Sequence, residues 1–350
     1  MLISLIIVLI LSGCHNTSEP EDGTAGQKFV QVVLDDSYFR MIGLTADGNI
    51  HVNAVETTST NKYTTDVTTW KGVKKIAAGY MNVAAVKKDG TVLYDNLNSE
   101  ILYRGRSVIV REPDGREVTH MINAELPHPL LDVSDWTDIV SVACGNYHIA
   151  GLKKDGTVVA RETDFEQPPG PGHNGVEVSS WTDIVEIAAG MNFTAGLRED
   201  GTVVTSPALW STQYRTERTD TWTDVIAISA SQWGLLGLRA DGTVMAAGPM
   251  KSQFLLSDWK DIQAVVSCEN LSVGLRKDGT VVTSFSAFSA MDSKELASWT
   301  DIVAIEASDF LVIGQKADGS MVTMYNRNYS ANITAFSEEF DKWNEAESHP

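Results

Sequence analysis

The stretch WTDIVEIAAGMNFTAGLREDGTVVT, residues 181–205, decides the fold because its pattern returns along the chain. It begins at Trp181, continues through alternating apolar residues to Gly190, and reaches an Asp–Gly pair at Asp200 and Gly201. Alternating apolar residues on both sides of an Asp–Gly pair are a strong signal for a β-hairpin, since the tight turn requires positive φ. The stretch therefore predicts a small antiparallel β-meander.

The same unit occurs seven times in the chain. Its Asp–Gly pairs begin at Asp47, Asp89, Asp155, Asp200, Asp241, Asp278 and Asp318. A Trp stands nineteen residues before six of these pairs: Trp70, Trp136, Trp181, Trp222, Trp259 and Trp299. The pairs lie on average about 45 residues apart, which is the length of one four-stranded propeller blade. The sequence therefore predicts an all-β fold, a seven-bladed β-propeller over residues 28–350.

The first and last units differ from the others at the Trp position. Lys28 stands where the first unit should carry its Trp, and Trp343 near the C-terminus has no Asp–Gly pair after it. We expect the C-terminal segment to supply the missing Trp beside a strand at residues 30–34, which gives circular closure between the two ends. A further Asp–Gly pair, at Asp114, lacks the pattern and lies in an insertion over about residues 95–133.

Two positions in each unit hold small residues. The first, four residues before each Asp–Gly pair, holds Gly43, Ala85, Gly151, Gly196, Gly237, Gly274 and Gly314. The second, nine residues after the Trp position, holds Ser37, Gly79, Gly145, Gly190, Ser231, Cys268 and Ser308. Because glycine weakens a strand, we attribute the first set to backbone crowding near the propeller axis. We expect the repeated Trp residues to pack between neighbouring blades.

Residues 181–190 and 196–203 resemble the regulator of chromosome condensation repeat. That repeat builds a seven-bladed propeller family which also includes secreted bacterial inhibitors of β-lactamase, and the similarity covers roughly residues 29–343. The glycine-rich tail of the family repeat is absent, because Thr-Ser-Pro-Ala follows Val204 and Thr-Ser-Phe-Ser follows Val282. The resemblance therefore implies the divergent bacterial secreted or lipoprotein branch rather than the nuclear exchange factor.

The start of the chain predicts export and a lipid anchor. Residues 2–11 are apolar apart from Ser4, a length that suits a secretory signal but is too short to span a bilayer. Leu-Ser-Gly-Cys at residues 11–14 resembles the bacterial lipobox, so we expect a signal peptide over residues 1–13 and lipid attachment at Cys14. The polar residues 14–27 then form a tether. The alternative is a plain signal peptide with an incidental Cys.

Charge limits the partners. The 350 residues carry 46 acidic and 27 basic side chains, a net charge of −19. Nucleic acid and anionic membrane surfaces are bound by displacing counterions with Lys and Arg, so this balance opposes both. We expect a localisation on the extracytoplasmic side of the cell membrane, with membrane contact through the lipid anchor alone and no nucleic-acid partner.

Catalytic and metal-binding signatures are missing. The sequence has no GxxxxGK[ST] phosphate loop, no HExxH and no GxSxG. Cys144 and His148 would suit a thiol–imidazole pair or a metal pair, but no third ligand or orienting carboxylate shares their spacing. The Asp residues of the Asp–Gly turns belong to no calcium-loop motif. We interpret a second set of Asp residues, each two positions after a Trp, as turn residues as well: Asp138, Asp183, Asp224, Asp261 and Asp301. We therefore predict no catalytic residue, no metal and no cofactor.

The connection after the second small position differs chemically from unit to unit. Equivalent loops of a propeller open on one face, so these side chains should form a ring around one mouth of the channel. The candidate binding residues are Tyr38, Phe39, Tyr80, Met81, Tyr147, Asn192, Trp233, Asn270 and Phe310. Two alternatives stay open: half of these side chains could tuck between blades, and the insertion at 95–133 is a second candidate contact.

A ring of aromatic and amide side chains on a rigid scaffold is typical of a recognition surface. We therefore interpret the chain as a non-enzymatic propeller that binds a protein or peptide partner outside the cytoplasm. The alternative function is a propeller that binds carbohydrate or cell wall, with or without hydrolase activity, since aromatic rings also stack on sugars.

Overall fold

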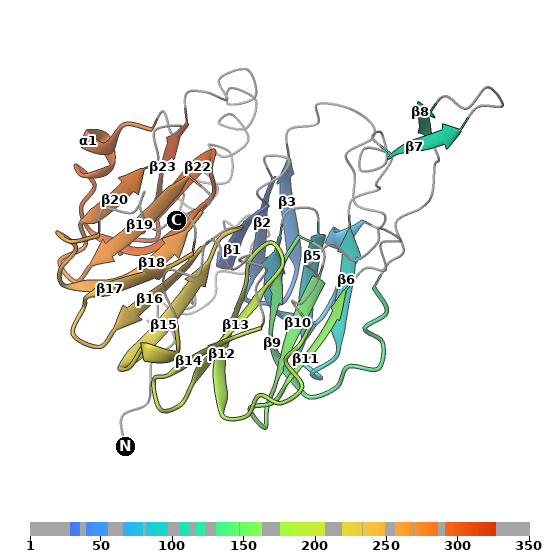
Figure 1. Ribbon diagram of the computed structural model, residues 1–350. Coiled ribbons are helices and arrows are strands. Elements are labelled where there is room, and N and C mark those ends of the chain that lie inside the picture. The colour runs from blue at the N-terminus through green and yellow to red at the C-terminus, as the bar shows by residue number, and fades with distance from the viewer. Residues whose placement is uncertain are drawn as a thin grey trace, which may run out of the picture.

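The computed structural model describes residues 29–35, 40–54, 66–79, 82–96, 106–111, 117–122, 131–146, 148–162, 176–206, 219–232, 234–248, 256–268, 270–285 and 291–326. These residues are almost entirely β-structure (Figure 1). The predicted signal peptide, the lipid-attachment residue Cys14, the tether and Trp343 lie outside them.

Seven three-stranded antiparallel sheets form the blades. In chain order, blades 1 to 7 are β1–β2–β3 (Phe29–Asp35, Arg40–Thr45, Ile50–Ala54), β4–β5–β6 (Val73–Ala78, Asn82–Lys87, Val92–Asn96), β9–β10–β11 (Ile139–Cys144, His148–Lys153, Val158–Glu162), β12–β13–β14 (Ile184–Ala189, Thr194–Arg198, Val203–Thr205), β15–β16–β17 (Val225–Ala230, Leu235–Arg239, Val244–Ala247), β18–β19–β20 (Ile262–Ser267, Leu271–Arg276, Val281–Phe285) and β21–β22–β23 (Ile302–Ala307, Leu311–Lys316, Met321–Tyr325). The predicted seven blades are confirmed. Much of the chain that follows each third strand, where a fourth would lie, is outside the described residues.

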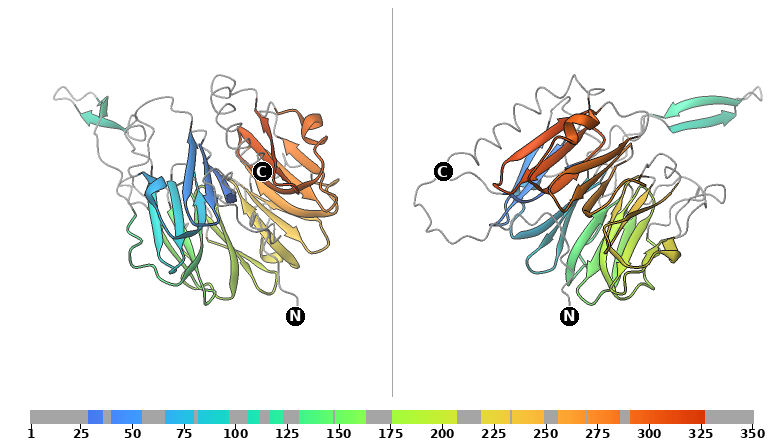
Figure 2. Two further views of the ribbon diagram at one scale, coloured as in Figure 1. Left: turned by 180° about the vertical axis from the view of Figure 1, so that it is seen from behind. Right: turned by 90° about the vertical axis from the view of Figure 1, so that its left-hand side faces the viewer.

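Short helical turns precede three of the repeat Trp residues in the described part of the chain. They are η1 (Val67–Thr69), η2 (Thr219–Thr221) and α1 (Ser293–Leu296). The insertion forms a separate two-stranded hairpin of β7 (Arg106–Arg111) and β8 (Glu117–Ile122). Figure 2 shows this hairpin projecting away from the blades in both views. The insertion therefore adds an appendage and leaves the ring of blades intact.

The repeat Trp residues pack between neighbouring blades, as predicted. Trp136 is 2% exposed and belongs to a cluster that joins Ala84 and Val86 of blade 2 to Ile139 and Ile149 of blade 3. Trp222 joins blades 4 and 5 in the same way. Burying such an aromatic ring supplies a large apolar contact at each joint.

The first set of small residues has a different cause from the one predicted. A Cβ atom on Gly151, Gly196, Gly237, Gly274 or Gly314 would lie 2.6–2.9 Å from a ring carbon of the Trp in the same unit. The glycines therefore make room for the Trp ring, and crowding at the axis is not the reason.

Phe29 takes this place in blade 1, because its ring lies where a Cβ on Gly43 would be. The first unit thus fills its Trp position with a residue of its own. The prediction that Trp343 fills this position concerns a residue outside the described part of the chain.

The Asp–Gly turns of blades 2 to 6 dock on the next blade. In blade 4, Asp200 Oδ1 accepts hydrogen bonds from the backbone N–H and the hydroxyl of Thr202 at 2.9 and 2.6 Å. Gly201 has φ +80°, and its carbonyl accepts a hydrogen bond from the N–H of Val225 in blade 5 at 3.1 Å. A Cβ on Gly201 would lie 3.2 Å from the backbone N of Asp224, so glycine is needed for the approach as well as the turn.

An Asp stands two residues after five of the six repeat Trp residues, and it is also a turn residue, as predicted. Asp138, Asp183, Asp224, Asp261 and Asp301 have φ between +56° and +62°. Asp tolerates this left-handed backbone better than most residues do, because its short polar side chain can bond locally. Turn geometry therefore accounts for both sets of Asp residues.

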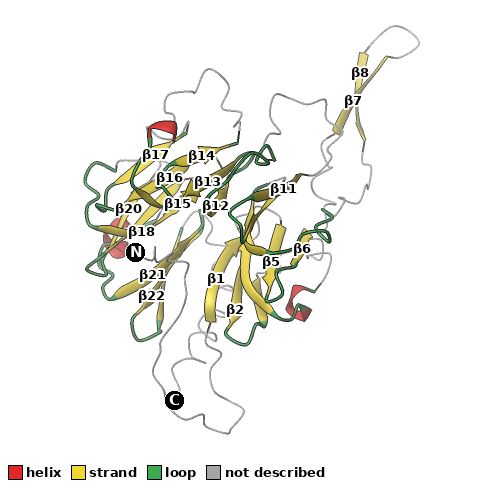
Figure 3. Cartoon of the chain, turned by 90° about the horizontal axis from the view of Figure 1, so that it is seen from below, coloured by secondary structure: helices red, strands yellow, loops and turns green. Residues whose placement is uncertain are grey.

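Blades 7 and 1 meet to close the ring. Phe29, Leu34 and Met41 of blade 1 share a buried cluster with Leu311 and Ile313 of blade 7. Figure 3 shows β1 beside β21 and β22, and β1 contacts β21 directly. The first strand and the last described blade therefore form a joint of the same kind as the other neighbouring blades.

Candidate functional site

Of the predicted binding residues, Asn192, Asn270 and Phe310 belong to the described part of the chain. The others, Tyr38, Phe39, Tyr80, Met81, Tyr147 and Trp233, lie outside it. The three that are placed nevertheless show how the connections are built.

Hydrogen bonds join these connections from one blade to the next. Asn146 N–H donates to the carbonyl of Met191 at 3.3 Å, and Met191 N–H donates to the carbonyl of Gln232 at 3.1 Å. Asn270 donates through its backbone N–H and its side-chain Nδ2 to the carboxylate of Asp309, at 2.9 and 2.8 Å. The described connections of blades 3 to 5 and of blades 6 and 7 are thus linked. We call the connections that contain residues 146, 191–192, 232, 270 and 309 the loop belt.

The side chains of Asn270 and Asn192 differ in their hydrogen bonds within the loop belt. Asn270 is committed to Asp309, so its amide fixes one connection against another. Asn192 is half-buried, and its Oδ1 is buried without a hydrogen-bond partner among the described residues. An unpaired amide oxygen is costly to bury, so Asn192 has an acceptor to offer a ligand.

Phe310 is buried between blades, which is the alternative that the sequence left open for half of these side chains. Its side chain is 4% exposed and lies in the cluster that joins blades 7 and 1. Its carbonyl accepts a hydrogen bond from Asn326 N–H at 2.8 Å. The large ring is buried because the closing joint offers it apolar neighbours from β1 and β2, which the local sequence does not reveal.

The second set of small residues allows the chain to fold back on itself. A Cβ on Gly145 would collide with the ring of His148, and one on Gly190 with the ring of Phe193. The residue three positions later therefore covers the glycine and closes the connection.

Cys144 and His148 serve as structural residues. Cys144 Sγ lies 3.7 Å from the carbonyl of Ala77 in blade 2, and His148 Nε2 lies 3.0 Å from Thr194 Oγ1 in blade 4. Burial lowers the pKa of His148 to about 4, so its ring is neutral at pH 7. Each side chain is engaged with a different neighbouring blade. Within the described ranges, no three His, Cys, Asp or Glu side chains are placed to hold a metal ion.

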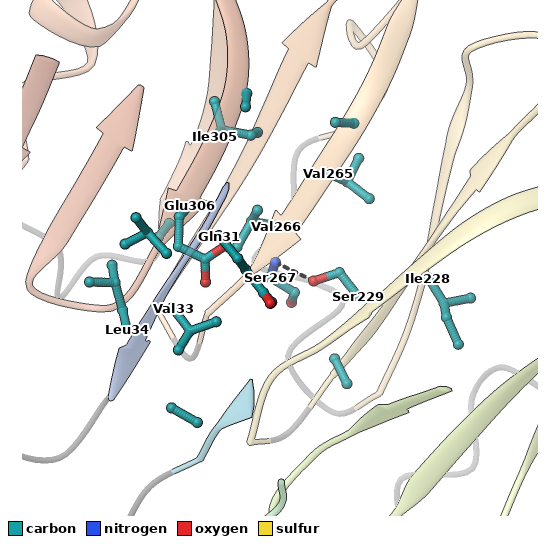
Figure 4. Close-up of a pocket in the computed structure, with 16 residues that line it drawn as sticks. Gln31, Val33, Leu34, Ile228, Ser229, Val265, Val266, Ser267, Ile305 and Glu306 are labelled. Carbon is teal, nitrogen blue, oxygen red and sulfur yellow. Dashed lines mark hydrogen bonds between the residues drawn. The ribbon is translucent and has the colours of Figure 1, made fainter. Parts of the chain in front are cut away.

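The inner strands line a central cavity of about 270 Å³ that is open to solvent on part of its boundary. Residues of β1, β4, β15, β18 and β21 line it. Most of the lining is Val, Ile, Leu and Ala, and the polar members are Gln31, Ser229, Ser267 and Glu306 (Figure 4). Sequence reasoning missed this site. The signal in the sequence was Glu306, which stands seven residues after Trp299, at a position of the first strand where most units carry Val, Ala or Ser.

Polar side chains on the inner strands bond to the next blade around the ring. Gln31 donates to the carbonyl of Ile76 at 2.8 Å and accepts from its N–H at 2.9 Å. Ser267 N–H donates to Ser229 Oγ at 2.9 Å. Glu306 of blade 7 accepts a hydrogen bond from the backbone of Leu34 in blade 1. The closing joint therefore uses the same kind of bond as the others.

Burial shifts the pKa of two glutamate side chains on the inner strands. It raises the pKa of Glu186 to about 7, although a hydrogen bond from Ile228 N–H and the charge of Lys75 both oppose the rise. Burial likewise lowers the pKa of Lys75, against the attraction of Glu186. Glu306 has no such opposite charge, and burial raises its pKa to about 8.

Two plant proteins and one yeast protein are among the solved structures that are similar to this chain. The ectodomain of the Physcomitrella patens receptor kinase CR4 has a TM-score of 0.54 and 11% identity over 84% of this chain and 72% of that one. The CRINKLY WD40 ectodomain of Arabidopsis thaliana ACR4 has a TM-score of 0.53 and 13% identity, over 85% and 95%. Yeast RCC1 (Prp20), solved with Kap60, has a TM-score of 0.50 and 12% identity, over 89% and 83%.

The fold is an RCC1-like seven-bladed β-propeller. The predicted resemblance to the regulator of chromosome condensation propellers is confirmed at the level of fold, which is all that such identities show. No protein-family model and no curated protein matches the sequence. No helix in the described residues is long and apolar enough to cross a membrane.

Proposed function

We propose that this chain is a non-enzymatic propeller that binds a protein or peptide partner, displayed by a lipid anchor on the extracytoplasmic side of the cell membrane. The loop belt carries the proposal, because it holds chemically different side chains at equivalent places on a hydrogen-bonded frame. A frame that is ordered before binding loses little conformational entropy when a partner docks.

The structural neighbours support a binding role. Yeast Prp20 was solved bound to Kap60, and a second Prp20 structure is described with its binding to Gsp1p and histones. Two further neighbours are receptor ectodomains. The net charge of −19 favours a partner with a basic surface, because opposite charges speed the encounter.

The binding face is tested by capturing partners from envelope extracts with the full chain in detergent. Tyr147→Ala and Trp233→Ala should each remove the captured partner, because aromatic anchors contribute most of the binding energy in a small patch. The matched control is Ile226→Ala, since Ile226 is 44% exposed at the end of β15 that adjoins the Asp–Gly turns. Loss of capture with Ile226→Ala alone would place the site on the opposite face. Capture by insoluble cell-wall material with no protein partner would favour the carbohydrate alternative.

The lipid anchor is tested separately at Cys14, whose thiol is the atom that would form the thioether. The unmodified protein should partition into the detergent phase, and Cys14→Ser should move it to the aqueous phase or leave it uncleaved. Detergent partitioning and processing that do not change in the variant would exclude the lipobox.

A further inference from the structure

The central cavity holds a carboxyl group without a balancing charge. Among the described residues that line the cavity, Glu306 alone has an ionisable side chain. The lining residues from β1, β4, β15 and β18 are Gln, Ser or apolar, so none of these strands offers a charge to Glu306 within the cavity. Lys75 and Glu186, also on inner strands, influence each other and do not line the cavity.

A second polar group in the cavity wall lacks a partner. Ser267 is 6% exposed, and its Oγ has no hydrogen-bond partner among the described residues. The hydroxyl of Ser229 accepts a bond from Ser267 N–H and keeps a second lone pair. Figure 4 shows Glu306, Gln31, Ser229 and Ser267 gathered in the same part of the cavity. Since unpaired buried polar groups are costly, this part of the wall is suited to a polar ligand.

The remaining wall is apolar. Val33, Leu34, Val266 and Ile305 line the cavity beside the polar group. A ligand that fits both regions has a compact polar head and a short hydrocarbon stem. A positive head supplies the opposite charge that the other lining residues lack, and an ammonium group brings three N–H donors to one carboxyl group and two hydroxyls.

We propose that the cavity beside Glu306 binds a primary alkylammonium group, carried either by a small free amine or by a lysine side chain. The carboxylate of Glu306 accepts one N–H, the hydroxyls of Ser229 and Ser267 accept others, and the apolar wall covers the stem. This site is separate from the loop belt, and it stands whether or not the loop belt binds a protein.

Binding is coupled to proton release from Glu306. With a pKa of about 8, the empty cavity holds the carboxyl mostly protonated at pH 7. An ammonium group requires the carboxylate, so one bound amine displaces about 0.9 proton at this pH. The apparent affinity should rise about tenfold from pH 6 to 7, about fivefold from pH 7 to 8, and less than about twofold from pH 8 to 9.

Calorimetric titration of the full chain with n-butylammonium tests the site. The titration is repeated at each pH and in two buffers that differ in ionisation enthalpy and carry no primary amine, which counts the protons released. n-Butanol is the neutral control of the same shape and should bind at least about tenfold more weakly. Glu306→Gln should weaken the amine by at least about tenfold at pH 8 and abolish proton release. Glu186→Gln, the matched control outside the cavity, should change the affinity by less than about threefold.

Several results would overturn the proposal: no butylammonium binding to the folded protein, equal binding of butanol, an affinity that does not depend on pH, or unchanged binding by Glu306→Gln. If Glu306→Gln does not fold, the proton count and the pH series of the unmodified protein decide. N-acetyl-lysine methylamide distinguishes the two sources. The same pH profile with this compound assigns the site to a lysine side chain, and binding of butylammonium alone assigns it to a free amine; both results support the site.

Discussion

Replacing Gly237 by Ala should destabilise the propeller, because the new Cβ would lie 2.6 Å from a ring carbon of Trp222. Ordinary carbon contacts are about 3.5–4.0 Å, so the ring must move by about 1 Å. Trp222 is 4% exposed and packs against Phe193 and Leu197 of the preceding blade, which oppose the movement. Overpacking of this kind costs about 1–3 kcal/mol. We expect that loss in the free energy of unfolding.

Urea denaturation at unchanged slope measures the effect, and a double variant identifies its cause. Trp222→Phe alone should also destabilise, because the smaller ring leaves a cavity. The pair Gly237→Ala and Trp222→Phe should lose less than the two single losses added together, by at least about 1 kcal/mol, since the methyl group then fills vacated space.

Blade 2 supplies a matched control, because Ala85 already occupies the same register there. Ala85→Gly should destabilise by about 0.5–1 kcal/mol through backbone entropy, so the sign of the change at this register depends on the blade. A Gly237→Ala protein within about 0.5 kcal/mol of the original, or strictly additive losses in the double variant, would refute the role of the Trp ring.

Three other predictions concern pH, closure and the left-handed turns. The pKa values of Glu186 and Glu306 are raised from 4.5 to about 7 and about 8, so their contribution to stability is fully present below pH 4.5 and is lost as the pH rises through 8. The melting temperature should therefore fall between pH 5 and 9, and a rise over that range would contradict this. Phe29→Ala should cost about 3–5 kcal/mol in urea denaturation, because it empties the joint of blades 7 and 1, and a loss below about 1 kcal/mol would show that the ring is held elsewhere. Asp224, at φ +60°, should tolerate Gly but lose about 1 kcal/mol as Ala, and equal melting of the two variants would argue against turn strain.

The number of blades and the turns could be predicted from the sequence because their signals are local. An Asp–Gly pair, its Thr and the Trp nineteen residues before it all lie within one unit, and the unit recurs. The reason for the glycines could not be predicted, because the pattern shows a small residue without showing which side chain lies over it. Gly196 stands in β13 and is separated from Trp181 by the whole of β12, and folding brings the Trp ring onto it.

The candidate site was harder to predict, because burial there depends on blades far apart in the chain. The sequence left open whether Phe310 is exposed or tucked between blades, because its neighbours Phe29 and Met41 come from the opposite end of the chain. Glu306 stands in the strand IVAIEA, residues 302–307, where a polar residue reads as the solvent face of an alternating strand. In a propeller both faces of that strand meet other blades, so the same residue lies inside.

The docking of the Asp–Gly turns of blades 2 to 6 on the next blade has a consequence for sequence divergence. The joint between Gly201 and Val225 is a carbonyl bonded to an N–H, and the same bond joins Gly90 to Ile139, Gly156 to Ile184 and Gly279 to Ile302. Main-chain atoms are common to all residues, so this register survives most changes of side chain in either blade. Outside side-chain pairs such as Asn270 and Asp309, a unit can therefore accumulate substitutions without a compensating change in its neighbour, which lets one ring present unlike connections.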